Sequence, residues 1–345
     1  MKTLTAHAAK DIRIEDREDP TPGPGEVLIA MSRGGICGSD LHYYNHGGFG
    51  TVRLKEPMIL GHEVSGHVLA LGDGVSGLTK GQLVAVSPSR PDYSSKYSRM
   101  GMHNQCLNMR FYGSAMPFPH IQGAFRELLV AQAEQCVPAD GLTPEEAALA
   151  EPLAVVLHAA RRAGDMAGKR VLVTGCGPIG LLAVAVARMA GAVEIHATDL
   201  AEFPLQKAKE LGADVVHNTA EGSETLAPLS AEKGYFDVAF ECSGAPAALH
   251  SAVEVLAPQS KLIQLGLGGD ITVPLQLITA KEISLVGSFR FHEEFATAIQ
   301  LMQSGRISVA SLVTQTMDLS VATEAFELAG DRSKAIKVQL KFGNG

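Results

Sequence analysis

The sequence lacks the features that mark nucleic-acid-binding and membrane proteins. It has no run of basic residues and a formal net charge of −8, which argues against nucleic acid or an acidic membrane as a partner. No uninterrupted apolar run reaches the roughly 18 residues that suggest a membrane span. The N-terminus reads as a short strand followed by charged residues, not as a signal peptide. We therefore expect small-molecule chemistry, away from membranes and nucleic acid.

Cysteine is also scarce. The five cysteines, Cys37, Cys106, Cys136, Cys176 and Cys242, are scattered and odd in number, which does not suit a disulfide framework. They fit a reducing compartment better, so we expect a cytoplasmic protein. There is no internal repeat or low-complexity segment, and 345 residues are more than one core usually fills. Two domains are the default expectation.

The chain changes character near residue 150. Up to that point short β-rich runs alternate with turn clusters, which indicates a β-rich domain over residues 1–150. Thr143 then caps a helix, and from Arg170 onward strands and helices alternate regularly. Six buried strands separated by helices predict a doubly wound parallel sheet of the Rossmann type over residues 151–290. The fold class is therefore α/β, with a second, β-rich domain.

The tail, residues 291–345, returns to mixed helix and strand. It ends in the strand-like run AIKVQLKF, residues 335–342. The simplest partner for this last strand is the first domain, which makes that domain discontinuous. Within the first domain, the sequence predicts strands over residues 25–31, 58–71 and 81–88.

A glycine-rich turn marks a dinucleotide site. In VLVTGCGPIG, three glycines follow an apolar strand and open a helix, the context that gives G-x-G-x-x-G its meaning. The first glycine permits a tight turn, the second lets a pyrophosphate approach, and the third allows close packing. Asp199 ends the next strand, where its carboxylate can accept hydrogen bonds from a ribose diol. The predicted cofactor-binding residues are Gly175, Gly177, Pro178, Ile179, Gly180 and Asp199.

The choice of cofactor depends on the residues after Asp199. No arginine or lysine occupies positions 200–204, where it would welcome a 2′-phosphate, so NAD is favoured over NADP. The alternative interpretation of this region is a glycine-rich turn with Asp199 capping a helix.

A second group of residues suggests a metal site. Cys37, His62, Glu63 and Glu151 together offer one sulfur, one nitrogen and one or two carboxylate oxygens. Zinc accepts this mixture in catalytic sites that keep a position open for water or substrate. Each residue alone has an ordinary explanation as a buried side chain. A competing hypothesis from another class is a zinc-free nucleotide-binding protein without dehydrogenase activity.

These motifs give the sequence a family resemblance. Six segments resemble those of zinc-dependent medium-chain dehydrogenases/reductases, in the polyol dehydrogenase branch. They are CGSDLHYY, GHEVSGHV, GAFREL, EPLAVVLHAARRAG, GCGPIG and GSFRF. The resemblance covers nearly the whole chain. It implies a GroES-like catalytic domain beside the Rossmann domain, oxidation of a secondary alcohol with hydride transfer to a nicotinamide cofactor, and a homodimer or homotetramer.

The resemblance also implies roles for individual residues. Cys37 and His62 hold a catalytic zinc with Glu63 as third ligand, while Glu151 either coordinates directly or holds the zinc water. Asp40 falls where the family hydrogen-bonds the ligand histidine. Ser39 and His42 fall where the family runs a proton relay. For His42 a surface imidazole without such a role is the alternative.

The substrate expectation rests on a narrower resemblance. Two segments, NQCLNMRFYGSAMPFPH and KEISLVGSFRF, are similar to segments of family members that act on aldonates. This resemblance implies oxidation of L-idonate to 5-keto-D-gluconate. Sorbitol, xylitol or another polyol is the alternative. A substrate carboxylate needs a cation, and Arg290 or Arg110 is our candidate. Either arginine could instead make a structural ion pair, and for Arg110 the two interpretations weigh about equally. Tyr43 and Phe111 are expected to line the pocket.

One segment departs from the family pattern. Relatives carry four cysteines that bind a structural zinc where this chain has Asp92, Ser95, Ser98 and Cys106. Serine hydroxyls do not ionise at neutral pH and are poor zinc ligands. We therefore expect one zinc per chain, the catalytic one, and a lobe held by hydrogen bonds and packing.

Overall fold

The computed structural model describes residues 1–222 and 224–343, which form two compact units. The first unit comprises Met1–Ala154, Phe291–Asp331 and Lys337–Gly345, and the second comprises Val155–Arg290 and Arg332–Ile336. None of the helices in the described residues is long and apolar enough to cross a membrane.

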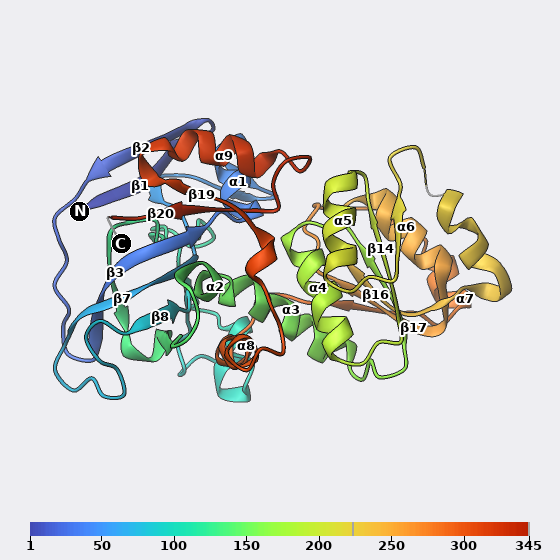
Figure 1. The fold of residues 1–345 in the computed structure, drawn as a ribbon, viewed down its shortest axis with the longest axis horizontal. Coiled ribbons are helices and arrows are strands. Elements are labelled where there is room, and N and C mark those ends of the chain that lie inside the picture. Colours follow the sequence, from blue (N-terminus) through green and yellow to red (C-terminus); the bar gives the residue numbers. More distant parts are fainter. Residues whose placement is uncertain (223, 344–345) are drawn as a thin grey trace. The chain divides into compact units, whose positions relative to one another are not determined.

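The first unit is built on a seven-stranded sheet, whose strand order is β12-β8-β7-β3-β20-β19, with β11 also paired to β3 (Figure 1). A smaller sheet has the order β2-β1-β6. The strands are β1 (Lys2–Ala8), β2 (Asp11–Asp16), β3 (Glu26–Gly35), β4 (Gly48–Phe49), β5 (Val52–Arg53), β6 (Met58–Ile59), β7 (Glu63–Leu71), β8 (Leu83–Val86), β9 (Ser89–Arg90), β10 (Arg110–Phe111), β11 (Leu128–Gln132), β12 (Cys136–Pro138), β19 (Val313–Asp318) and β20 (Lys337–Lys341). The helices are α1 (Gly38–His46), α2 (Pro144–Ala148), α8 (Glu294–Gln303) and α9 (Ala322–Gly330).

The final strand β20 pairs antiparallel with β3, placing Leu340 opposite Gly34, and parallel with β19. This confirms the pairing predicted for the end of the chain. In Figure 1, α9 lies along β20. The sheet therefore brings residues more than 300 positions apart, such as Gly34 and Leu340, into one layer.

The strand predicted over residues 58–71 is interrupted in the structure. β6 ends at Ile59 and β7 begins at Glu63, because Gly61 has a φ of +92°, a left-handed conformation that a continuous strand does not use. The prediction of one strand was wrong because alternating apolar residues do not reveal a local backbone turn. The interruption places His62 directly before β7.

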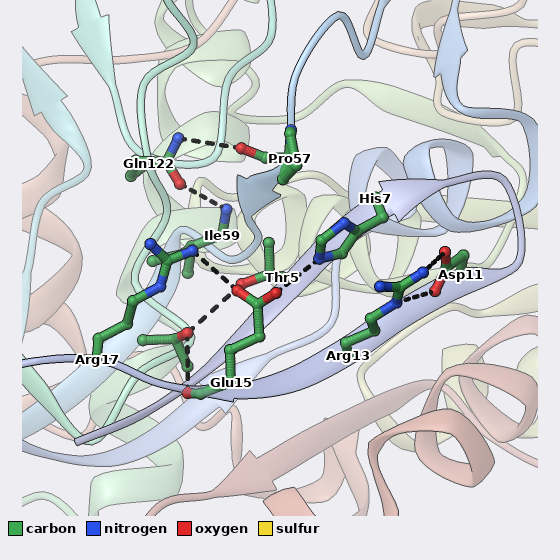
Figure 2. Close-up of polar contacts among 10 residues, drawn as sticks. Thr5, His7, Asp11, Arg13, Glu15, Arg17, Pro57, Ile59 and Gln122 are labelled. Carbon is green, nitrogen blue, oxygen red and sulfur yellow. Dashed lines mark hydrogen bonds and ion pairs between the residues drawn. The ribbon is translucent and has the colours of Figure 1, made fainter.

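The β1–β2 hairpin holds the segment that precedes this interruption. β1 pairs with β6, and the amide of Leu60 donates to Leu4 O at 3.1 Å. Figure 2 shows the polar face of the hairpin, where Glu15 lies 2.8 Å from both His7 Nε2 and the guanidinium of Arg17. On β6, the Ile59 amide donates to the side chain of Gln122, as the same figure shows.

The second unit contains a six-stranded parallel sheet of order β15-β14-β13-β16-β17-β18. This is the doubly wound order with its reversal beside the first strand. In Figure 1, α4 and α5 lie on one side of the sheet and α6 on the other. The strands are β13 (Arg170–Thr174), β14 (Glu194–Asp199), β15 (Val215–Asn218), β16 (Phe236–Glu241), β17 (Leu256–Gln264) and β18 (Ser284–Gly287). The helices are α4 (Pro178–Met189), α5 (Glu202–Glu210), α6 (Pro246–Val255) and α7 (Leu275–Ala280), and α3 (Ala150–Ala163) runs from the first unit into the second.

The α/β fold class is confirmed: a β-rich domain accompanies a Rossmann sheet of six parallel strands. Thr143 caps α2 as expected, accepting from the amide of Glu146. The helical segment that follows is split, however, because α2 ends at Ala148 and α3 begins at Ala150.

Candidate metal centre and cofactor turn

Three of the predicted ligands come together in the first unit. One donor atom each from Cys37, His62 and Glu63 lies within 4.8 Å of the others, and no other such group of three occurs in residues 1–222 and 224–343. Cys37 is the residue before α1, while His62 and Glu63 follow the turn at Gly61. His62 and Glu63 are buried and Cys37 is partly exposed.

Asp40 connects the two segments that carry these ligands. It is fully buried, and its carboxylate accepts from the amide of Cys37 at 3.0 Å and from the amide of Gly61 at 3.1 Å. The nearest Asp40 oxygen lies 3.9 Å from His62 Nδ1, which is too long for a hydrogen bond. The structure thus gives Asp40 a different partner from the one expected: it fixes the backbone beside both ligands.

Lys337 is a neighbour of the site that we did not predict. Its Nζ lies 2.8 and 2.7 Å from the two carboxylate oxygens of Glu63 and donates to Ile36 O at 3.1 Å. Both side chains are almost completely buried, with exposures of 2% and 1%. Across the β3–β7 pair, Gly35 faces Glu63, and a Cβ at Gly35 would overlap the carboxylate. The Glu63 carboxylate is therefore held from two sides.

The donor set fits a zinc ion. Burial, reinforced by the negative charge of Glu63, raises the pKa of the Cys37 thiol to about 12. A dication would stabilise the thiolate that burial disfavours. His62 Nδ1 is buried without a hydrogen-bond partner in the described structure. Thiolate, imidazole and carboxylate together form a ligand set that catalytic zinc sites use.

Glu151 lies outside the group of three but close enough to share its electrostatics. It sits in the first turn of α3 and is buried. Burial raises the pKa of its carboxyl to about 8, while His62 lowers it and Glu63 raises it. Because the donor atoms that lie within 4.8 Å of one another include Glu63 and not Glu151, the geometry favours Glu63 as the carboxylate nearest to Cys37 and His62.

The predicted relay residues lie on α1. Ser39 is partly exposed and His42 is exposed, with its ring centroid 5.9 Å from that of Phe49. Partial burial of the ring and the neighbouring His46 lower the pKa of His42 below its ordinary value. An imidazole of this kind stays neutral near pH 7 and can accept a proton. Like His46, His67 is outside the metal group; its Nδ1 lies 3.1 Å from Ser32 Oγ.

The predicted substrate residues occupy different environments. The Phe111 ring packs 5.7 Å from the His62 ring, so it does reach the metal group. Tyr43 is buried, and its hydroxyl accepts from the amide of Ala115 at 3.0 Å. Arg110 is exposed on β10, and because strand neighbours point to opposite faces it lies on the face opposite Phe111. Arg290 belongs to the second unit, where its guanidinium lies 4.9 Å from the Phe289 ring centroid.

In the second unit, the glycine turn has the form expected for a dinucleotide site. Gly175 has a φ of +84°, and a Cβ at Gly180 would overlap Gly175 O. Gly177 differs from both: its φ is −68°, and an added Cβ would meet no protein atom within 4 Å. The protein's own packing does not require glycine at position 177, whereas the close approach of a pyrophosphate does. Pro178 and Ile179 open α4 directly after this residue.

The carboxylate of Asp199 binds backbone amides of the glycine turn and of the turn that follows β14. One carboxylate oxygen accepts from the amide of Cys176 at 2.7 Å, and the other accepts from Leu200 at 2.7 Å and Ala201 at 3.0 Å. The Leu200 and Ala201 amides precede α5, which begins at Glu202, so Asp199 orders the turn before this helix and does not cap the helix itself. A carboxylate has about four acceptor positions, so three bonds leave capacity for a ribose hydroxyl.

The lobe around Cys106 is held by hydrogen bonds. The Cys106 sulfur accepts from the amide of Asp92 at 3.1 Å and from Ser95 Oγ at 3.4 Å. Ser95 Oγ also lies 3.1 Å from Ser98 Oγ, within hydrogen-bond distance. The four positions remain adjacent, and His103 instead packs its ring 4.5 Å from that of His292.

Sequence reasoning missed Lys337 and a second buried charge, Glu241, at the end of β16. The available signal was the same in both cases: a charged residue beside the apolar residues of a predicted strand. A buried charge needs a specific partner, so such a position deserves a functional hypothesis.

Comparisons with known proteins agree with this geometry. Residues 23–141 match the alcohol dehydrogenase GroES-like domain, and residues 178–304 match the zinc-binding dehydrogenase domain. The chain is 44% identical to the L-idonate 5-dehydrogenase (NAD(P)(+)) of Escherichia coli (strain K12) over 318 residues, which covers 92% of each. It is 38% identical to the sorbitol dehydrogenase of Gallus gallus over 343 residues, covering 98% of this chain and 95% of the other.

Solved structures of dehydrogenases also match this chain over nearly its whole length. The crystal structure of L-idonate 5-dehydrogenase from Escherichia coli matches with a TM-score of 0.94 and 41% identity, covering 99% of this chain and 98% of the other. That of 2R,3R-butanediol dehydrogenase from Bacillus subtilis matches with a TM-score of 0.88 and 31% identity, covering 99% of each.

Fold and site together define a two-domain alcohol dehydrogenase. The chain belongs to the zinc-binding dehydrogenase family, with a GroES-like domain and an NAD(P)-dependent Rossmann domain. Its relatives include idonate and sorbitol dehydrogenases, so it is an oxidoreductase of the polyol dehydrogenase type.

Proposed function

We propose that this enzyme oxidises L-idonate reversibly to 5-keto-D-gluconate, using NAD. The observation that carries the proposal is the group formed by Cys37, His62 and Glu63, in a chain 44% identical to an L-idonate 5-dehydrogenase. NAD is favoured because positions 200–204 contain no cation that would pair with a 2′-phosphate.

We propose that Cys37, His62 and Glu63 hold one catalytic zinc and that Glu151 stays nearby. Zinc bound there supplies the Lewis acidity that makes a substrate hydroxyl acidic, and the nicotinamide supplies the hydride acceptor. Asp40 keeps both ligand segments in place, and Lys337 holds Glu63. The lobe with Asp92, Ser95 and Ser98 holds no zinc in this proposal.

The chain's own groups then move the proton. Ser39 accepts the proton of the substrate hydroxyl while its own hydroxyl proton is passed on toward His42, which is exposed and releases a proton to solvent. The lowered pKa of His42 supports this role, because the imidazole is neutral at the pH where the proton must leave. Phe111 packs against His62 and shields the metal group on one side.

An aldonate also needs a partner for its carboxylate. Arg290 is our first candidate, because Arg110 is exposed on the strand face opposite Phe111. A guanidinium can bind a carboxylate through two parallel hydrogen bonds. Arg290→Ala and Arg110→Ala should be compared on L-idonate and on sorbitol; the arginine that recognises the acid group loses kcat/KM on idonate selectively.

The second candidate function is sorbitol or xylitol oxidation by the same machinery. It is favoured by the similarity to sorbitol dehydrogenases over 98% of the chain. We further propose a homodimer or homotetramer; the cytoplasmic location stays a prediction.

A substrate panel tests these proposals. L-idonate, D-gluconate, sorbitol and xylitol should each be offered with NAD and NADP, following the absorbance of the reduced cofactor. We expect L-idonate with NAD to give the highest kcat/KM, and chelation to abolish it until zinc is restored. Full activity after metal removal would contradict the zinc proposal, and a preference for sorbitol would replace the substrate.

A further inference from the structure

Glu241 is a fully buried carboxylate at the last position of β16. It accepts from the amide of Ser243 at 2.8 Å, from the amide of Gly244 at 3.0 and 3.1 Å, and from Gln264 Nε2 at 2.6 Å. The hydroxyls of Ser243 and Thr174 also reach it. These donors are all neutral. The charge is therefore stabilised by hydrogen bonds from the surrounding loops.

Those donors come from three adjacent strands. Thr174 ends β13, Gln264 ends β17, and Ser243 and Gly244 follow β16 itself. The main chain adds further bonds, because the amide of Leu265 donates to Glu241 O at 2.9 Å. One carboxylate thus connects the carboxyl ends of the three central strands, the edge at which doubly wound sheets bind their ligands.

The loop after β16 packs directly against the glycine turn at Gly175. A Cβ added to Gly175 would lie 2.8 Å from Ser243 Cβ, so the Ser243 segment fits against the first glycine of the motif. A Cβ at Gly266 would overlap the Gly244 amide, and one at Gly268 would overlap Gly244 O. The loops touch backbone to backbone, so a shift of the Glu241 loop must move its neighbours.

The carboxyl edge of the parallel sheet also has buried polar atoms that make no hydrogen bond within the described residues. Gln264 Oε1 and Ser288 Oγ are buried and have no hydrogen-bond partner among the described residues. The two residues are adjacent, because the amide of Ser288 donates to Gln264 O at 3.0 Å. Unpartnered buried oxygens are costly and typically mark a place where a ligand or water completes the site.

We propose that Glu241 is a positioning residue for the dinucleotide: it fixes the loops after β13, β16 and β17 in the arrangement that binds the cofactor. This inference rests on the proposed use of NAD, and it adds a residue that determines how tightly the enzyme binds that cofactor. Glu241 acts through Ser243, Gly244 and Gln264.

The test compares Glu241→Ala and Glu241→Gln with a control in the same domain. Lys281 is buried, and its Nζ donates to the carbonyl oxygens of Val253, Glu254 and Leu256, so Lys281→Met removes a comparable set of hydrogen bonds away from the glycine turn. NADH binding is titrated by fluorescence, together with melting temperature, zinc content and the KM for substrate at saturating NAD.

We expect Glu241→Ala to raise the Kd for NADH about 10-fold or more, with zinc content and substrate KM unchanged. Glu241→Gln should be intermediate: its amide oxygen still accepts from Ser243 and Gly244, but its NH2 group faces Gln264 Nε2. Gln264 cannot simply rotate, because Nε2 also donates to Gly266 O at 2.9 Å. Lys281→Met should lower the melting temperature and leave the Kd within twofold.

Two results would overturn the inference: a Kd within twofold of wild type for Glu241→Gln, or an equal weakening in Lys281→Met. If Glu241→Ala does not fold, the glutamine variant decides. The titration contains no sugar, so a wild-type protein that binds NADH but does not oxidise idonate contradicts the proposed substrate and leaves this inference standing.

Discussion

Lys337 Nζ lies 2.8 and 2.7 Å from the two carboxylate oxygens of Glu63, in an almost completely buried pair. The two residues are 274 positions apart and meet because β20 returns to β3, which pairs with β7. Breaking a buried ion pair by removing one partner is strongly destabilising, because the other charge remains buried and uncompensated. Lys337 therefore stabilises a carboxylate that we propose as a zinc ligand.

Lys337→Met should destabilise the zinc-free protein by about 3–5 kcal/mol, and the zinc-loaded protein by less, since bound zinc compensates Glu63. Denaturant unfolding of both forms measures this difference. Lys341→Met, on the same strand but partly exposed, is the control and should change stability by less than about 0.5 kcal/mol. An equal loss in both metal states would contradict the idea that zinc and Lys337 share Glu63.

Gly177→Ala should separate cofactor binding from stability. The backbone at Gly177 has an ordinary φ of −68° and open space at the Cβ position, so the melting temperature should stay the same or rise slightly. The methyl group would enter the space proposed for the pyrophosphate, and we expect the Kd for NADH to rise at least 10-fold.

Gly180→Ala is the matched comparison for that variant. A Cβ at Gly180 would overlap Gly175 O, so this substitution should lower the melting temperature itself. Unchanged NADH binding by Gly177→Ala would remove the reason for placing the pyrophosphate at this turn.

Restoring cysteine at three positions should create a second zinc site. Ser95 Oγ lies 3.4 Å from Cys106 Sγ and 3.1 Å from Ser98 Oγ, and the Asp92 amide lies 3.1 Å from the same sulfur. Three sulfurs would therefore lie close together, and a cysteine at position 92 would be the fourth ligand that a tetrahedral zinc site needs. We expect elemental analysis to find one zinc per chain in the wild type and two in the Asp92→Cys/Ser95→Cys/Ser98→Cys variant.

Adding Cys106→Ser to that triple variant should weaken the second site and serves as its control. Two zinc ions per wild-type chain would show that the present lobe already binds metal. A triple variant that stays at one would show that the lobe has lost the geometry as well as the ligands.

His42 should set the acid limb of the pH profile. Partial burial and His46 lower its pKa, so the imidazole is neutral above its ordinary value of 6.5 and becomes protonated only at lower pH. A neutral base is needed to export the proton, so kcat/KM for alcohol oxidation should hold above pH 6.5 and fall below it. His42→Gln should lower kcat/KM by about 100-fold near neutral pH and flatten this limb. A limb that persists unchanged in His42→Gln would assign it to another group.

The predictability of the fold differs between its two domains. In the second, apolar strands, helices and the glycine turn follow one another locally, so periodicity alone indicated the parallel sheet. In the first, the run from 58 to 71 looked like one strand, and only the structure shows the left-handed Gly61 that interrupts it. The bond from the Gly61 amide to Asp40, 21 residues away, accompanies that turn and is invisible to a local pattern.

The candidate site shows the same division. Cys37, His62, Glu63 and Glu151 could be selected from their ligand chemistry and the family motifs. The distances between their donor atoms could not be predicted from the sequence. The structure brings the donor atoms of Cys37, His62 and Glu63 within 4.8 Å of one another and leaves Glu151 outside this group. Lys337 and Glu241 were missed because the role of a charged residue in a strand depends on the groups that face it in the folded protein.

The sequence by itself determined the class of chemistry, because donor atoms, glycine spacing and the acid after the second Rossmann strand are properties of residue type and short separation. Only the tertiary structure decided how those groups are held: β20 carries Lys337 to Glu63, and Glu241 connects three strands. The physical reason is that a buried charge must be neutralised or hydrogen-bonded by whatever the folded chain places around it, and those partners come from distant parts of the sequence.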